Sequence, residues 1–130
     1  MYEATTRHIR VSVEPVFLDE QSSPDEDHYV WAYQVKIEND GIEPVQLLNR
    51  HWQISDARGQ LQEVKGEGVV GEQPMLKPGE IFEYTSGTPL ATPSGIMFGS
   101  YEMETKTGER FNIQIPAFSL DSPYQARRLN

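Results

Sequence analysis

The chain contains no cysteine, and this absence excludes several kinds of site at once. A disulfide scaffold, a thiolate zinc site, an iron–sulfur cluster and a cysteine nucleophile all require that residue. Positive charge is also scarce, because 11 lysines and arginines stand against 20 aspartates and glutamates. The resulting net charge of −9 repels phosphate backbones, so we exclude nucleic acid as a binding partner.

Long apolar runs are missing too. No stretch approaches the roughly 20 apolar residues of a membrane-spanning helix, so we expect no membrane insertion. The first residues, Met1 to His8, lack the apolar segment of a secretory signal, and we therefore expect a cytoplasmic protein. The 130 residues fit a single domain, 1–130, and 10% aromatic residues supply material for a core.

What is present is the pattern of β-strands. From Tyr29 to Ile37, apolar and polar residues alternate with a period of two. Similar short runs, separated by turn residues, predict about seven strands, and no window has a helical period over three turns. The change of phase at Pro15 is typical of a bulge on an edge strand, and Pro116 is expected to end the last strand. The segment 39–41, Asn-Asp-Gly, is expected to form a turn with positive φ.

Seven short strands without helices indicate an all-β sandwich or barrel. Trp52 shares its strand phase with Leu48 and Ile54, and a buried tryptophan on the third predicted strand is typical of immunoglobulin-like sandwiches. We therefore favour the sandwich, with Trp31 or Trp52 in its core. Two segments, 19–28 and 119–130, are expected to be loose.

A glycine-rich segment is the first candidate site. Gly66, Gly68 and Gly71 match the G-x-G-x-x-G pattern of dinucleotide-binding loops. The following segment 72–79 contains two prolines and cannot form the helix which that motif requires, and Lys65 is the only cation beside the loop. We interpret the glycines first as serving backbone geometry, and the binding of a small anion, pyrophosphate or nucleotide is the alternative.

An acidic segment is the second candidate. Residues 19–28 include five carboxylates and no lysine or arginine. Asp25 and Asp27 could attract a divalent cation weakly, although the glycine and the glutamate of a calcium-binding loop are missing. The alternative is a solvated acidic loop. The three histidines are too far apart in sequence to predict a zinc site, so we predict no metal site.

The segment around Trp52 is the third candidate. Arg50 shares the core phase and is expected at the sheet rim beside an acidic partner, whereas His51 is expected on the other face with Asn49 and Gln53. This pattern is typical of a core strand with a solvated face, or of a recognition patch formed by Arg50 and His51. No nucleophile lies in a recognisable catalytic context, so we predict no catalytic residue, no cofactor and no enzymatic activity.

Several motifs follow one another along almost the whole chain: Glu20 to Ser22, Tyr29 to Tyr33, Leu47 to Trp52, Val64 to Pro74, Tyr84 to Gly87 and Ile115 to Phe118. In this order they resemble the motifs of the ApaG family.

The resemblance implies a sandwich similar to fibronectin type III and immunoglobulin domains. It also implies a bacterial, cytoplasmic setting and a genetic association with cobalt resistance and magnesium efflux. The appearance of the same domain in eukaryotic F-box and polymerase-interacting proteins implies a protein-interaction module.

Three functions stay open at this point. The first is a non-enzymatic module that binds a protein partner, with a homodimer left open, and affects cation homeostasis through that partner. The second is a binder of small anions at residues 66–71. The third is a phosphate-ester hydrolase with a metal in the acidic loop.

Overall fold

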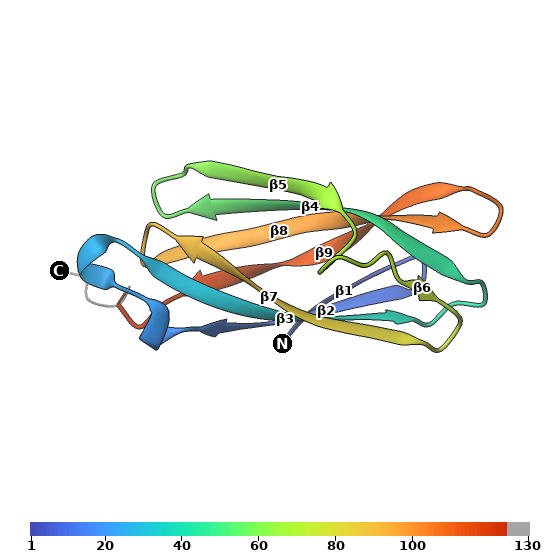
Figure 1. Ribbon diagram of the computed structural model, residues 1–130, viewed down its shortest axis with the longest axis horizontal. Coiled ribbons are helices and arrows are strands. Elements are labelled where there is room, and N and C mark those ends of the chain that lie inside the picture. The colour runs from blue at the N-terminus through green and yellow to red at the C-terminus, as the bar shows by residue number, and fades with distance from the viewer. Residues whose placement is uncertain (125–130) are drawn as a thin grey trace.

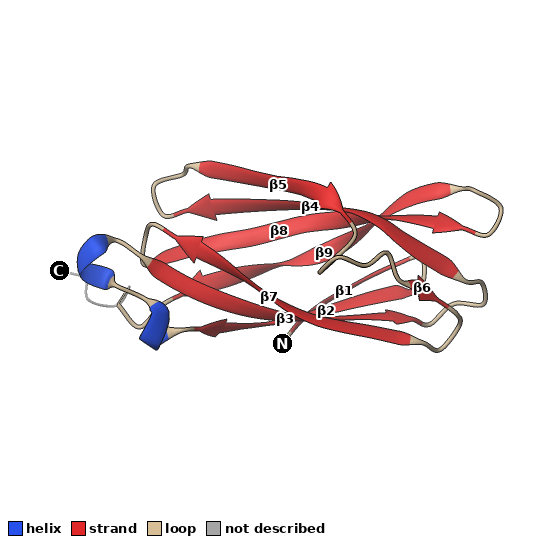
Figure 2. Ribbon diagram, viewed as in Figure 1, coloured by secondary structure: helices blue, strands red, loops and turns tan. Residues whose placement is uncertain are grey.

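The computed structural model describes residues 1–124 and consists almost wholly of β-strands (Figure 1). Two short 3-10 turns, η1 and η2, are its only helical elements (Figure 2). In chain order the elements are β1 (Tyr2–Thr6), β2 (Ile9–Phe17), η1 (Asp19–Gln21), η2 (Pro24–Glu26), β3 (Tyr29–Asn39), β4 (Val45–Asp56), β5 (Leu61–Glu67), β6 (Met75–Leu76), β7 (Ile81–Leu90), β8 (Ser94–Thr105) and β9 (Arg110–Asp121).

The strands form two antiparallel sheets that pack face to face. One sheet has the order β1-β2-β3-β7, and the other has the order β5-β4-β8-β9, with β6 paired to β4 beyond the end of β5. The long strands run along the length of the molecule, and β5 lies at the open edge of its sheet (Figure 1). The predicted all-β, immunoglobulin-like sandwich is confirmed.

Strand β3 shows why this sequence forms a sandwich. Every second residue from Tyr29 to Ile37 is buried, with at most 6% of its surface exposed, and the residues between them face outward. One face of the strand therefore contributes only apolar side chains to the core, as the alternation predicts.

The two tryptophans both lie in the core, with exposed fractions of 4% for Trp31 and 2% for Trp52. The centroid of the Trp52 ring lies 5.2 Å from that of Tyr33 in the facing sheet, and 6.2 and 6.1 Å from those of Tyr101 and Phe118. Such tilted and edge-on contacts add to the free energy gained by burial alone. The expectation that a tryptophan fills the core is confirmed for both.

Two strands are additional to the seven expected. β1 is short, and the turn that follows it consists of Arg7 and His8, which have φ values of 48° and 68°. Neither residue type is a usual turn former, so the sequence gives no sign of this hairpin. β6 has only two residues, which is too short for an alternating pattern to detect.

The bulge expected at Pro15 and the strand end expected at Pro116 are both wrong, whereas the expected edge position of Pro15 agrees with the structure. The β2–β3 pairing continues without a shift through Pro15, and β1 begins at Tyr2 opposite Val13, so Pro15 lies on an open stretch of edge and no bulge is needed. Strand β9 continues through Pro116 to Asp121, because a register shift opposite residues 97–99 leaves the proline out of the ladder. The expected tail therefore does not begin at residue 119, and its residues 125–130 lie outside the described part.

Two further expectations need correction. A bulge between Leu47 and Asn49 changes the phase of β4, so that Leu47, and not Leu48, is fully buried on the same face as Trp52. The turn after β3 contains no positive φ at residues 39–41. Asn39 is instead completely buried, and its side chain, rather than a left-handed backbone, holds the loop.

The acidic segment that we expected to be loose is folded into η1 and η2. Ser22 fixes it to the neighbouring strands, since its Oγ donates to Leu18 O (2.8 Å) and accepts from Val30 N (2.9 Å). The backbone N–H of Ser23 also donates to His28 O at 2.7 Å. The segment therefore closes one end of the sandwich as an ordered structure.

Candidate functional site

A groove of about 460 Å³ crosses the outer face of the β5-β4-β8-β9 sheet, which we call the outer-face groove. Strand pairing sets its residues in two rows across the sheet. One row contains Lys65, His51 and Ser100, and the next contains Glu67, Asn49, Glu102 and Asn112. The predicted orientation of His51 and Asn49 toward this face agrees with their place in the lining.

Polar side chains in the outer-face groove are held by their neighbours. His51 Nε2 lies 2.7 Å from Glu63 Oε2, and Asn49 Nδ2 donates to Glu102 Oε1 at 2.7 Å. Lys65 makes no ion pair within residues 1–124. The groove thus combines fixed hydrogen-bonding groups with one free cation, an arrangement that can bind an extended polar segment.

Arg50 lies at the edge of the groove but points toward the glycine loop. Its Nη1 donates to the carbonyl oxygens of Glu67 (3.0 Å) and Gly68 (2.9 Å). A β-carbon added to Gly66 would come within 2.8 Å of the guanidinium, so the arginine lies directly against this glycine. The expected acidic partner of Arg50 is wrong: two backbone carbonyls take its place.

Each glycine of the motif has a different structural reason. Gly66 leaves room for Arg50. Gly68 has φ of 64°, and a β-carbon there would lie 2.2 Å from the Glu72 carbonyl oxygen. Gly71 has φ of 81° and follows Val70, whose φ is 44°, which is the pattern of a two-residue type I′ turn.

The backbone donors of this loop are largely occupied. Gly68 N donates to Leu48 O at 2.8 Å, while Val69 and Glu72 bond each other in both directions, at 2.8 and 2.9 Å. An anion-binding nest needs several free N–H groups that point to one place. The loop leaves few such groups, and its nearest unpaired cation, Lys65, lies on the outer face beside His51.

Three buried tyrosines lie behind Arg50, and the sequence analysis did not predict their contact. The hydroxyls of Tyr84 and Tyr101 are hydrogen-bonded to each other. Burial raises the pKa of both, and burial also raises the pKa of Tyr33. The three phenols therefore stay neutral, and the Tyr84–Tyr101 hydrogen bond links the two sheets within the core.

The acidic segment does not gather its carboxylates around one point. Within residues 1–124, no group of three or more histidine, aspartate or glutamate side chains is arranged to hold a metal ion. Asp27 ends η2 in the left-handed conformation with φ of 54°, and Asp19 Oδ1 accepts a hydrogen bond from Tyr124 at 3.0 Å. Within residues 1–124, no third metal ligand therefore lies beside Asp25 and Asp27.

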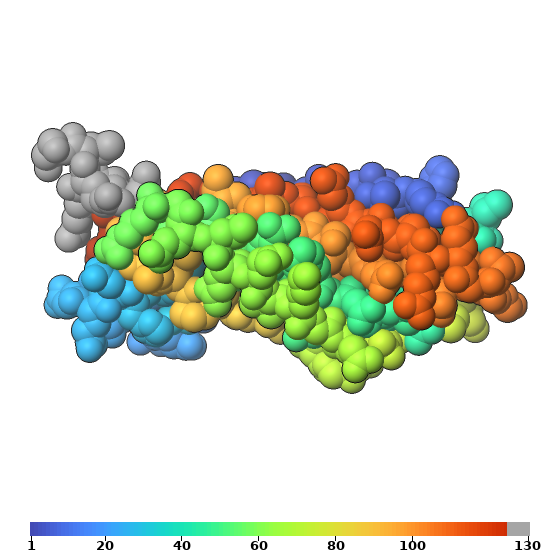
Figure 3. All heavy atoms as spheres, turned by 90° about the horizontal axis from the view of Figure 1, so that it is seen from above, coloured from blue at the N-terminus to red at the C-terminus, as the bar shows by residue number. Residues whose placement is uncertain are grey.

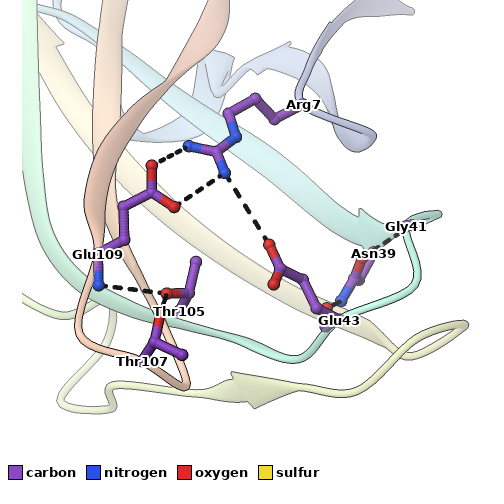
Figure 4. Close-up of polar contacts among 7 residues, drawn as sticks. All are labelled: Arg7, Asn39, Gly41, Glu43, Thr105, Thr107 and Glu109. Atoms are coloured by element: carbon purple, nitrogen blue, oxygen red, sulfur yellow. Dashed lines mark hydrogen bonds and ion pairs between the residues drawn. The ribbon is translucent and has the colours of Figure 1, made fainter.

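A second polar cluster, at the other end of the sandwich, also had no sequence signal (Figure 4). Arg7 forms two hydrogen bonds to Glu109, of 3.0 and 3.2 Å, lies 3.9 Å from Glu43 and stacks 4.1 Å above the Phe111 ring. Arg7 and Glu109 are 102 residues apart in sequence. One side chain thus ties together three loops that only the fold brings close.

Comparison with known proteins agrees with this architecture. The ApaG domain model matches residues 19–105. Protein ApaG of Paramagnetospirillum magneticum is 65% identical over 130 residues, which is 100% of both chains, and protein ApaG of Agrobacterium fabrum is 62% identical over the same span.

No helix within residues 1–124 is long and apolar enough to cross a membrane.

Solved structures are similar as well. A crystal structure of a Bordetella pertussis protein described as ApaA has a TM-score of 0.86 and 50% identity, covering 88% of this chain and 94% of that chain. An X-ray structure of a structural genomics target has a TM-score of 0.83 and 46% identity, covering 89% of this chain and 88% of that chain. The sequence matches and the fold lead to one conclusion: the chain belongs to the ApaG family.

Proposed function

We propose that the chain is a non-enzymatic protein-interaction module, and that its binding surface is the outer-face groove. The observation that supports this proposal is the set of polar side chains that are already fixed across three strands. His51 is held by Glu63 and Asn49 by Glu102, each at 2.7 Å. Side chains that are fixed before binding lose little conformational entropy when a partner binds.

This function would give the domain its effect on cobalt and magnesium through the partner protein and not through direct contact with the cation. We also propose a cytoplasmic setting, where such a partner would be met. A reaction would require a nucleophile or base directed at a substrate, and His51 and Asn49 are instead bonded to Glu63 and Glu102. Because Arg50 is bonded to two carbonyls of the glycine loop, we propose that the recognition patch consists of His51 and its row, without Arg50.

A second candidate is the binding of pyrophosphate or a nucleotide beside the glycine loop. The observation in its favour is that Arg50, Lys65 and Gly66 line the same groove. Arg50 already donates to two carbonyls, and the loop lies between Glu67 and Glu72 in a chain of net charge −9. We therefore expect no better than millimolar affinity for such an anion.

The first experiment compares two variants in a capture assay from cell lysate. Ser100→Arg places a long cation in the middle of the outer-face groove, where the serine is half-buried. Thr85→Arg makes the same kind of change on the outer face of the opposite sheet and serves as the control. We expect a stoichiometric protein that is retained by the wild type and by Thr85→Arg but lost with Ser100→Arg.

Three outcomes would contradict or redirect this proposal. Equal capture by both variants would remove the groove from the binding surface. A dimer that dissociates only in Ser100→Arg, seen by sedimentation, would make a second copy of this chain the partner. Calorimetric titration with pyrophosphate and ATP, with and without Mg²⁺, would favour the second candidate if it gave a dissociation constant in the low micromolar range.

A further inference from the structure

We propose that a second groove, at the end of the sandwich beside β6, binds an acidic segment of a partner protein that carries an apolar side chain. This end groove has a volume of about 540 Å³ and shares no lining residue with the outer-face groove. Its walls come from residues 44–46, 75–78 and 104–106, which adjoin in Figure 3 as teal, yellow-green and orange atoms. The proposal does not depend on the function assigned to the outer face.

The lining of the end groove is largely apolar. Pro44, Val45, Met75 and Pro78 contribute to it, and Met75 is 58% exposed. Methionine is flexible and polarisable, and it adapts well to apolar side chains of different shapes. Ile42, on the loop before Pro44, is 97% exposed but lines a neighbouring pocket and not the end groove. An apolar side chain of a partner would therefore find matching surface here.

Charge defines the second property of the occupant. Lys77 and Lys106 both line the end groove, although the whole chain has only four lysines and a net charge of −9. Neither makes an ion pair within residues 1–124. The one carboxylate in the lining, that of Glu104, lies 3.3 Å from Arg110 and is thereby partly neutralised.

A ligand in the groove lies close to the two lysines, whereas the net charge of −9 is spread over the whole chain. At physiological salt, exposed charges more than roughly 8 Å apart are largely screened from each other. An acidic segment inside the groove would thus meet two unpaired lysines and the Arg110-bound carboxylate of Glu104, with the Glu80 carboxylate bonded to Lys77 N at 2.7 Å beside them. A basic segment would meet the two lysines as like charges. Charge complementarity therefore favours carboxylates beside the apolar side chain.

The walls of the end groove are fixed from inside by Asn39. This residue is fully buried, and its Nδ2 donates to Glu43 O (2.8 Å) and Leu76 O (3.0 Å), which adjoin the lining residues of two walls in the chain. Its Oδ1 accepts from Gly41 N at 2.9 Å. A single amide therefore sets the separation between the loop that carries Ile42 and strand β6.

The third wall is tied to the same frame. Glu109 N donates to Thr105 Oγ1 at 3.2 Å, and the Glu109 carboxylate binds Arg7, which also approaches Glu43 (Figure 4). Arg7 has φ of 48° within the turn between β1 and β2. Non-glycine residues in that conformation persist only where their surroundings hold them, so the end of the sandwich is a rigid frame around the groove.

The test uses two short synthetic peptides that differ only in charge. One has a central leucine flanked by glutamates, and the other has the same leucine flanked by lysines. Nuclear magnetic resonance titration of the labelled full chain reports which backbone amides shift. We expect the acidic peptide to shift amides in segments 44–46, 75–79 and 104–106, and we expect the basic peptide to leave them unchanged.

Two pairs of variants test the two properties separately. Lys77→Glu/Lys106→Glu should lower the affinity roughly tenfold, whereas Lys36→Glu/Arg58→Glu, with the same change in net charge elsewhere, should not. Met75→Gln should weaken binding as well, whereas Ile81→Gln, another exposed apolar residue outside the lining, should not. All of these residues are exposed or half-buried, so the fold should be kept.

The proposal would be overturned by any of three results. These are equal shifts with the basic peptide, shifts confined to the outer-face groove, and unchanged affinity in Lys77→Glu/Lys106→Glu. Loss of the leucine from the acidic peptide without loss of binding would likewise contradict the apolar part of the proposal.

Discussion

The glycine loop precedes β6 in the chain, and Met75 of β6 lines the end groove. The two regions differ in what their cationic side chains bind. At the glycine loop, both hydrogen bonds of Arg50 go to carbonyl oxygens of the loop itself. At the end groove, Lys77 and Lys106 have no ion-pair partner within residues 1–124. Arg50, beside the glycine motif, therefore supports the structure of the loop, whereas in our proposal the two lysines of the end groove are available to a ligand, as Lys65 is on the outer face.

The comparison is tested most strongly at Gly68. Alanine at this position would have to adopt φ near 64°, with its β-carbon 2.2 Å from Glu72 O. We expect Gly68→Ala to lower the free energy of unfolding by roughly 3 kcal/mol, or about 10 °C in Tm. Gly59→Ala is the control, because Gly59 has φ of 81° but open space around it, and it should cost only about 1 kcal/mol.

Thermal unfolding followed by circular dichroism measures both variants. If the glycines served a ligand alone, Gly68→Ala would keep the stability of the wild type and lose only the binding of a nucleotide. Equal effects of Gly59→Ala and Gly68→Ala would show that close backbone contact at Glu72 plays no part.

The sequence allowed the sandwich to be predicted because its strands carry local signals. β3 alternates over 11 residues, and each tryptophan falls in the buried phase. The bulges in β4 and β9 were missed, since a bulge depends on how two strands meet and not on one strand's pattern.

The candidate sites were less predictable for the same reason. The motif of Gly66, Gly68 and Gly71 could be found by eye, but its meaning depends on Arg50, which lies on another strand. Arg7 and Glu109 meet across 102 residues of sequence, and Asn39 reaches Leu76 across 37. Contacts of this kind follow from strand order and register, which local patterns do not determine.

A double-mutant cycle between Arg50 and Gly66 refines the comparison. Arg50→Ala removes two hydrogen bonds to carbonyls, so we expect a loss of about 2 kcal/mol in the free energy of unfolding. Gly66→Ala should destabilise the wild type by about 1 kcal/mol, because its β-carbon would lie 2.8 Å from the guanidinium.

In the Arg50→Ala background, however, Gly66→Ala should have almost no effect, since Gly66 has no positive φ and the obstructing group is gone. Urea unfolding of the four proteins gives the coupling energy directly. Strict additivity of the two substitutions would mean that Arg50 and Gly66 do not act as a unit.

The smallest expected effect is the pH dependence of the exposed pair that braces the end groove. The hydrogen bond from Arg7 holds the pKa of Glu109 below its ordinary value. Stability from a carboxylate with a lowered pKa is present above its ordinary pKa and is lost as the pH falls through the folded value. Glu109→Gln should therefore lower Tm slightly at neutral pH, and the difference from the wild type should shrink and vanish as the pH falls through the lowered pKa of Glu109.

Glu26→Gln provides the matched control, because Glu26 is an exposed carboxylate without an ion pair within residues 1–124. Its Tm should follow that of the wild type at every pH. Added salt should shrink the Glu109→Gln difference at neutral pH, since the pair is exposed and screened. A difference that persisted in acid would show that Glu109→Gln acts through a property of the side chain other than its charge.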